Sequence, residues 1–211
     1  MIKRIVFALL IVSLVVSCTQ KQPVKIACIG DSITECIEMY NYPIQLDSIL
    51  GPGYNVLNCG RSSATLLKLS ETPIWGCTEF YNAFAFEPDI ITIKLGTNDS
   101  KPENWNEEVF LQDLQAMVDT LRTIPSNPKI YFCLPVPAYN HAWGISDSVI
   151  RNGVIPSIQK IALQNNLQVI DLYKPLSNHI EFFPDSIHPN KVGARAIAEI
   201  IAKELKISLP N

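Results

Sequence analysis

Five short apolar segments, each rich in β-branched residues, constrain the fold of this chain more than any other feature. None of them alternates cleanly between apolar and polar residues, which is typical of strands that are covered on both faces. The segments between them show the spacing of amphipathic helices. Strands and helices that alternate in this way predict a parallel sheet with right-handed crossovers and helices on both faces. The expected strands span 24–29, 54–59, 89–95, 129–134 and 167–172.

Four helices are expected between and after these strands, and polar residues that could cap them mark several of the starts. They lie at 42–50, after Asn104 or Asn106, within 146–164, and after Asn190. The third is expected to be interrupted near Gly153 and Pro156, because glycine and proline both weaken a helix interior. Residues 60–88 and 172–189 show no regular pattern. Long excursions of this kind in an α/β fold tend to be functional.

Composition fits a single globular domain with a substantial core. The chain has 211 residues, of which 47% are hydrophobic and 18% charged, and no run of Lys or Arg suggests a nucleic-acid partner. No CxxC pair or clustered His/Cys spacing suggests a metal. Cys28, Cys59 and Cys133 fall in expected strands and are interpreted as core residues. Cys36 and Cys77 could form a disulfide in an exported protein, but sequence does not establish their proximity.

The first residues differ from the rest of the chain. Two basic residues precede a run of twelve residues with only Ser13 polar, which is short for a spanning helix and typical of a signal peptide. The sequence VVSC resembles the lipobox of bacterial lipoproteins. We therefore expect a signal peptide over 1–17, lipid on Cys18 with a tether over 18–24, and the folded domain over 25–211; an uncleaved anchor helix is the alternative. Membrane attachment would then be through acyl chains.

Four polar segments follow strands of the expected sheet. Gly30–Thr34 (GDSIT) follows the first strand, 60–63 the second and 96–99 the third, while 185–188 lies in the loop beyond the fifth. In a parallel sheet, the loops that follow the strands emerge at one carboxyl edge, where open α/β sheets bind ligands. The fold would therefore gather these four segments into one site.

The residue types in these segments suit acyl transfer. A serine hydroxyl becomes a nucleophile when a neighbouring base takes its proton, so Ser32 and His188 are paired as nucleophile and base. Asp185 lies three residues before His188 and could fix its tautomer. The oxyanion that develops needs donors, for which the backbone N–H groups of Ser32 and Gly60 and the side-chain amide of Asn98 are candidates.

Each of these residues has a simpler interpretation when it is taken alone. Ser32 could merely cap a helix, Gly60 and Asn98 could be turn residues, and Asp185 with His188 could form a surface turn before the last helix. It is the ordered set that favours a hydrolase.

The same set resembles a known family. GDS at Ser32, NCG at Gly60, GTND at Asn98 and DSIHPN through His188 are similar to the four sequence blocks of the GDSL, or SGNH, hydrolases. The resemblance covers the chain from about Val24 to its end. It implies a flavodoxin-like, three-layer α/β/α fold with a five-stranded parallel sheet, and a serine esterase or lipase without a cofactor. It also implies the roles given above for the five residues Ser32, Gly60, Asn98, Asp185 and His188.

Two further features bear on this resemblance. Family members often have a second glycine in the block around Gly60, where this chain has Ser63, and this departure could alter the loop and the pocket beside it. The chain also lacks the G-x-S-x-G elbow of α/β-hydrolases, because threonine follows at position 34. Asp31, which precedes the expected nucleophile, is expected to contribute to substrate binding.

The substrate is expected to be a small-molecule or glycan ester. Trp105 and Trp143 follow strand ends and could stack on sugar rings at the rim, although partial burial in the core is the alternative for each tryptophan. GTNDSKPENW and WGISD resemble GDSL esterases of gut-type bacteria that remove acetyl groups from glycans. We therefore expect an exported, lipid-anchored carbohydrate O-acetylesterase with Trp143 at the substrate. The alternatives are a lysophospholipase or thioesterase, and a non-catalytic phosphate-binding protein of flavodoxin type.

Overall fold

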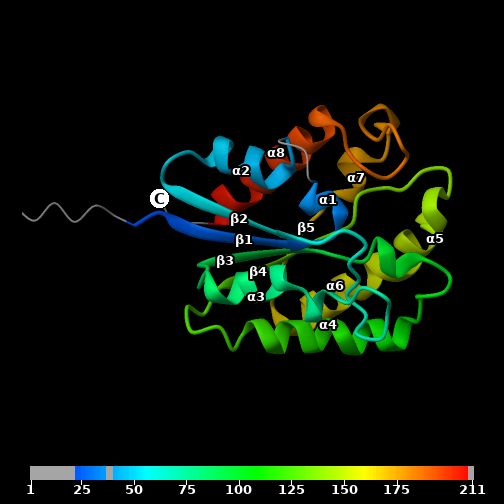
Figure 1. The fold of residues 1–211 in the computed structure, drawn as a ribbon, viewed down its shortest axis with the longest axis horizontal. Helices are drawn as coiled ribbons and strands as arrows, with labels where there is room; N and C mark the ends of the chain where they lie inside the picture. The colour runs from blue at the N-terminus through cyan, green and yellow to red at the C-terminus, as the bar shows by residue number, and fades with distance from the viewer. Residues whose placement is uncertain (1–21, 37–39, 209–211) are drawn as a thin grey trace, which may run out of the picture.

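A five-stranded parallel sheet forms the centre of the molecule (Figure 1). The computed structural model describes residues 22–36 and 40–208. The strand order is β2-β1-β3-β4-β5, which is the flavodoxin-like order of doubly wound sheets. The strands are β1 (Val24–Gly30), β2 (Tyr54–Gly60), β3 (Ile90–Lys94), β4 (Lys129–Cys133) and β5 (Gln168–Ile170). All five predicted strands are thus confirmed, with ends that differ by no more than two residues.

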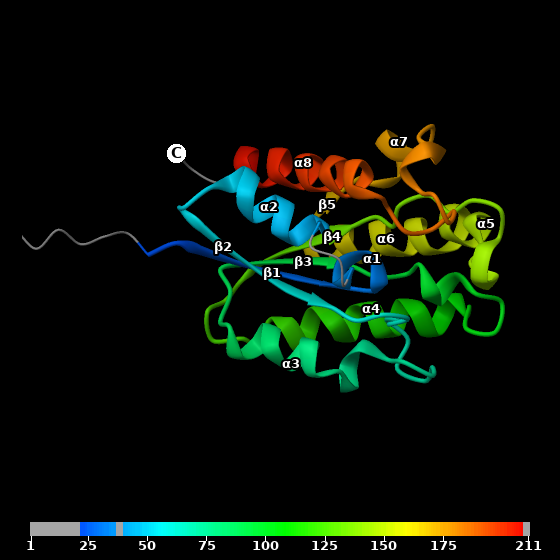
Figure 2. The same ribbon diagram turned by 45° about the horizontal axis from the view of Figure 1, so that its top comes forward.

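Helices cover both faces of the sheet, so the predicted three-layer architecture is confirmed (Figures 1 and 2). One face carries α1 (Ser32–Glu35), α2 (Tyr42–Leu50), α7 (Tyr173–Leu176) and α8 (Lys191–Ser208). The other carries α3 (Thr78–Ala85), α4 (Glu107–Leu121) and α6 (Ile155–Asn165). The short helix α5 (Asp147–Val149) lies at the end of the molecule where the strands end.

The two helical layers enclose two separate apolar cores. Successive residues of β1 alternate between them: Ile26 and Cys28 pack with α2 and α8, whereas Ala27 and Ile29 pack with α3 and α4. Because side chains of a strand point alternately to opposite faces, a strand that lies between two cores is apolar at most positions on both faces. This explains why the strand sequences show no alternation.

Polar caps fix several helix starts. Asn41 accepts from the backbone N–H of Ile44 at the start of α2, and Asn190 accepts from Gly193 at the start of α8. Of the two candidates for α4, Asn106 is the cap, since it accepts from the N–H of Val109. These local hydrogen bonds explain why the helix starts could be predicted from sequence.

One helical segment was not expected from the sequence, and a second contains the break that the sequence predicts. The stretch 60–88 contains α3, which begins without a side-chain cap and shows only a short apolar face. The helix expected within 146–164 is divided by a π-helical segment, Ile150–Val154, with Gly153 inside it. A Cβ atom on Gly153 would lie 2.3 Å from the Trp105 ring, so this close packing requires glycine. The predicted interruption is confirmed.

Several expectations about the N-terminus and the cysteines have different outcomes. Residues 1–17, Cys18 and the first part of the 18–24 tether lie outside the described residues. Within 22–36 and 40–208, no helix is long and apolar enough to cross a membrane.

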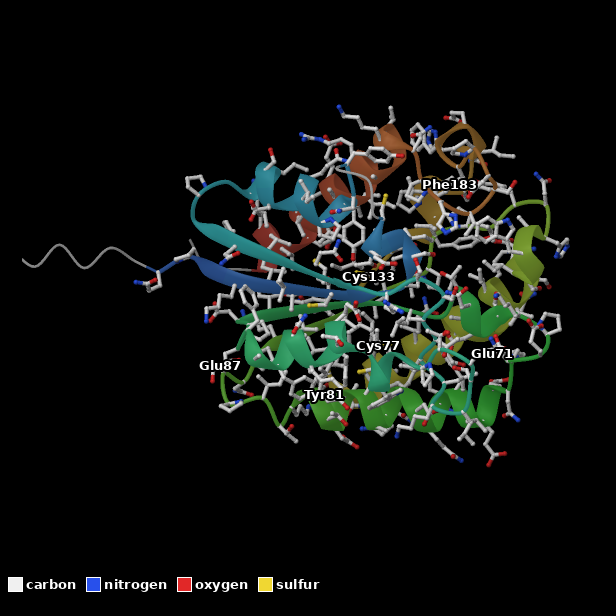
Figure 3. All side chains as sticks on the ribbon, viewed as in Figure 1. Glu71, Cys77, Tyr81, Glu87, Cys133 and Phe183 are labelled. Atoms are coloured by element: carbon white, nitrogen blue, oxygen red, sulfur yellow. The ribbon has the colours of Figure 1, made fainter. Side chains whose placement is uncertain are left out.

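Cys28, Cys59 and Cys133 are buried, as predicted. No disulfide joins Cys77 to Cys36: Cys77 lies on the α3 side of the sheet (Figure 3), whereas α1, which Cys36 follows, lies on the other side.

Candidate active site

The four polar segments meet at the carboxyl edge of the sheet, as the topology predicts. This edge lies at the end of the molecule where Figure 3 shows Glu71 and Phe183, whereas Glu87 lies at the opposite end. A cavity of about 410 Å³ opens there. Ser32, Asn98, Asp185 and His188 all line it, together with Trp143. The residues come from segments up to 156 positions apart, which the parallel sheet brings to one place.

A chain of two side-chain hydrogen bonds links Ser32, His188 and Asp185. Ser32 Oγ lies 2.8 Å from His188 Nε2, and His188 Nδ1 lies 2.6 Å from Asp185 Oδ2. An ionised carboxylate only accepts, so His188 Nδ1 carries the proton and Nε2 is left to accept from the serine hydroxyl. This is the geometry that lets an imidazole take a proton from a serine.

The loop before α8 holds Asp185 in a fixed orientation. Asp185 Oδ1 accepts from the backbone N–H groups of Ile187 and His188, at 3.0 and 2.6 Å, while its other oxygen faces the imidazole. Partial burial raises the pKa of Asp185, but the hydrogen bonds from His188 and Ile187 outweigh it and leave the pKa below its usual value. Asp185 therefore stays ionised beside the histidine.

Asn98 is held at the cavity wall by its neighbours. It starts a short 3₁₀ turn after β3, Asn98–Ser100, and its Nδ2 donates to the carbonyl of Ala64 at 3.1 Å. The backbone carbonyl of Asn98 accepts from the side-chain amide of Asn104. A side-chain amide has two N–H groups, so one remains to donate into the cavity.

Gly60 does not lie where the sequence suggested. Its N–H donates to the side-chain oxygen of Asn58 at 2.9 Å, and Gly60 is not among the residues that line the cavity. A Cβ atom on Gly60 would lie 2.1 Å from the backbone nitrogen of Glu35. The expectation that Gly60 donates to an oxyanion is therefore corrected: the missing Cβ admits the backbone of α1, not a substrate.

Ser63 takes the position at the cavity that was expected for Gly60. It lines the cavity, and its φ of 63° lies in the left-handed region, which glycine adopts more readily than serine. Within the described part of the chain, its N–H has no acceptor. The departure from the second glycine of the family pattern was the one sequence signal that could have identified this residue.

The expectation that Asp31 binds substrate is also wrong. The Asp31 side chain is fully buried and pairs with Lys94 Nζ at 2.9 and 3.0 Å. It also caps α1 by accepting from the N–H of Ile33. Sequence reasoning missed Lys94, because a lysine at the end of an apolar strand is usually exposed.

Asp99, next to Asn98, is buried and bonds to the loop that follows β2. Its two carboxylate oxygens accept from the buried N–H groups of Leu66 and Leu67, at 3.1 and 2.9 Å. Complete burial raises the pKa of Asp99 to about 7, although the backbone hydrogen bonds oppose the shift. Asp99 therefore anchors the loop that carries Ser63 and the carbonyl of Ala64.

The three tryptophans have different environments. Trp143 is 66% exposed, and its ring centroid lies 5.1 Å from that of His188 at the cavity mouth. Trp105 packs against Phe110, and Trp75 donates its ring N–H to the carbonyl of Leu66. Only Trp143 of the three lines the cavity. Among the described residues, no group of three or more His, Cys, Asp or Glu side chains could hold a metal ion.

Fold and site together define a class: a flavodoxin-like α/β protein with the Ser–His–Asp arrangement of hydrolytic enzymes. Comparison with family models agrees. The chain belongs to the GDSL-like lipase/acylhydrolase family, whose model matches residues 28–196.

Individual relatives refine this picture. An acetylxylan esterase from Xylanibacter ruminicola is 42% identical, over 89% of this chain and 44% of its own length. The chain thus spans about half the length of this curated relative. Two crystal structures share the fold: a carbohydrate acetylesterase from Sinorhizobium meliloti (TM-score 0.70, 17% identity, 88% of this chain and 100% of the other) and the acetyl xylan esterase AlAXEase (TM-score 0.67, 22% identity, 86% and 100%).

The close approach of Gly60 to α1 leads to a stability prediction. Gly60→Ala should lower the free energy of unfolding by about 1–3 kcal/mol or more, because the added methyl group meets backbone atoms. Gly53→Ala is the matched control, since nothing lies within 4 Å of its Cβ position. Urea unfolding measures both. A Gly60→Ala protein that is fully stable but slow in ester hydrolysis would contradict this assignment.

Proposed function

We propose that this protein is a serine esterase that removes O-acetyl groups from carbohydrate. The observation that carries the proposal is the 2.8 Å contact between Ser32 Oγ and His188 Nε2, with Asp185 behind the imidazole and an open cavity in front. The serine–histidine pair supports acyl transfer as the reaction. We infer that the ester is an acetylated carbohydrate because the 42% identical relative is an acetylxylan esterase.

The reaction has two halves. Ser32 Oγ attacks the acetyl carbon while His188 Nε2 takes its proton, and the imidazolium is stabilised by the Asp185 carboxylate. His188 then gives this proton to the sugar oxygen as the C–O bond breaks, which leaves an acetyl group on Ser32. Water attacks the acyl-enzyme with His188 again as base. Acetate departs, and the proton returns to Ser32.

The negative charge on the acetyl oxygen needs donors at the cavity. The N–H groups of Ser32 and Ser63 have no protein acceptor within the described part of the chain, and Asn98 has one amide N–H to spare. We infer that these three groups form the oxyanion hole. Donors that are fixed before the reaction stabilise the transition state without reorganising.

Variants of this set test the mechanism. Ser32→Ala and His188→Ala should remove nearly all turnover, Asp185→Asn should cost up to about 10⁴ in kcat by analogy with measured triads, and Asn98→Ala about 10²–10³. The measurement is p-nitrophenyl acetate hydrolysis, with thermal unfolding as the control for folding. Equal losses of stability in all four variants would make them structural instead.

The substrate assignment is tested by acetate release from acetylated xylan, pectin and sialic acid, followed by time-resolved NMR. Activity should fall steeply from acetyl to octanoyl p-nitrophenyl esters. A protein that prefers octanoyl esters would be a lysophospholipase or thioesterase. A protein that releases no acetate, leaves Ser32 unlabelled by a fluorophosphonate and is stabilised by phosphate would be a binding protein.

Trp143 is proposed to stack on the sugar that carries the acetyl group. Trp143→Ala should raise KM for an acetylated xylo-oligosaccharide about 2–10-fold, the value of one aromatic contact, with a smaller effect on p-nitrophenyl acetate. Tyr81 is a matched control, because it is 60% exposed but lies on α3, away from the carboxyl edge (Figure 3). Equal effects of Trp143→Ala and Tyr81→Ala would contradict the assignment.

We also propose that the protein is exported and lipid-anchored in the cell envelope. The support is the apolar run before VVSC and the resemblance of that sequence to a lipobox. In a bacterial host, the full chain should sediment with membranes and incorporate labelled palmitate. Cys18→Ser should abolish the labelling. Palmitate in the Cys18→Ser protein would contradict the proposal.

A further inference from the structure

A fully buried ion pair lies next to the turn that carries Ser32. Lys94 is the last residue of β3, Asp31 follows β1 directly, and neither side chain has exposed surface. Lys94 Nζ donates to both carboxylate oxygens, at 2.9 and 3.0 Å, and lies 3.5 Å from the hydroxyl of Thr97. Lys94 is paired with Gly30 in the sheet. The ion pair therefore bridges two neighbouring strands where both end.

The same carboxylate shapes the turn around Ser32. Asp31 Oδ1 accepts from the N–H of Ile33 at 3.0 Å, and the Asp31 carbonyl accepts from the N–H groups of Thr34 and Glu35. Ser32 stands between Asp31 and Ile33, both of which take part in these contacts. One side chain thus joins the first turn of α1 to β3, with Ser32 inside the joined segment.

Stability alone is a poor explanation for these charges. Both ions lose their hydration on burial. A protein in which a buried ion pair is replaced by apolar side chains of similar volume is often as stable as the original, or more stable. The ion pair instead fixes the orientation of the groups that it joins, because charge-assisted hydrogen bonds are short and geometrically specific. Orientation matters here: Ser32 must meet an imidazole that comes from a separate loop, and a misplacement of about 1 Å can cost about 10²-fold in rate.

We propose that Lys94 and Asp31 are positioning residues, whose buried ion pair holds the Ser32 hydroxyl at hydrogen-bonding distance from His188. The proposal rests on the proposed function, since it requires Ser32 to be the nucleophile. Both side chains act through Ser32: they are fully buried, and neither lines the cavity.

The test is the double variant Lys94→Met/Asp31→Asn. Asparagine keeps an oxygen that can cap the N–H of Ile33, and methionine fills the volume of lysine without charge. The melting temperature should stay close to that of the wild type, because no unpaired charge is left buried. The kcat for p-nitrophenyl acetate, per serine labelled by a fluorophosphonate, should fall on the order of 10²-fold with little change in KM.

Controls separate the outcomes. Lys94→Met alone leaves a buried carboxylate without its partner and should be both less stable and slow. Arg195→Met/Glu199→Gln removes an exposed ion pair of 2.8 Å and should change neither property. If the double variant does not fold, Asp31→Asn, assayed well below its own melting temperature, should show the same loss of kcat per labelled serine.

Wild-type kcat in the folded double variant, or in Asp31→Asn if the double variant does not fold, would overturn the positioning role while leaving the proposed function intact. An inactive, unlabelled wild-type protein would overturn the proposed function itself, and the positioning role with it.

Discussion

The hydrogen bond between Ser32 and His188 joins residues that are 156 positions apart, and the parallel sheet is what makes it possible. Each crossover returns the chain to the same edge, so the loops that follow β1, β2 and β3 and the segment before α8 converge there. The apolar strands keep the sheet buried between two helical layers. The polar residues at its carboxyl edge are thereby presented on a rigid support.

Three of the polar sequence blocks pair a residue at the cavity with a buried one that holds the block in place. Asp31 supports Ser32 through Lys94, and Asp99, next to Asn98, anchors the loop that carries Ser63. Gly60 permits the close contact of β2 with α1, three residues before Ser63. Several residues of the sequence motifs therefore hold the backbone in position. Only some of the motif residues lie where they could contact a substrate.

The chemistry and the substrate rest on different grounds. The relay of Ser32, His188 and Asp185 supports acyl transfer whatever the ester, because it acts on the acyl carbon alone. Any preference for the alcohol part of the ester depends instead on the rim of the cavity. There, Trp143 stands beside His188 on a loop in which Asn140, His141 and Trp143 all have positive φ. Such a conformation is costly for residues other than glycine and is often found at binding sites.

The sequence by itself determined the strands, most helix starts and the fold class, and it predicted that Ser32, Asn98, Asp185 and His188 would meet at one cavity. Each of these depends on local periodicity, capping or the order of motifs. The tertiary structure alone decided that Ser63 and not Gly60 faces the cavity, that Asp31 turns inward to Lys94, and that α3 forms within 60–88. These outcomes depend on which way a side chain or an amide points once distant strands pack together. The close approach of two backbone segments and the burial of a side chain depend on the packing of distant parts of the chain. The residues next to each position in the sequence do not determine them.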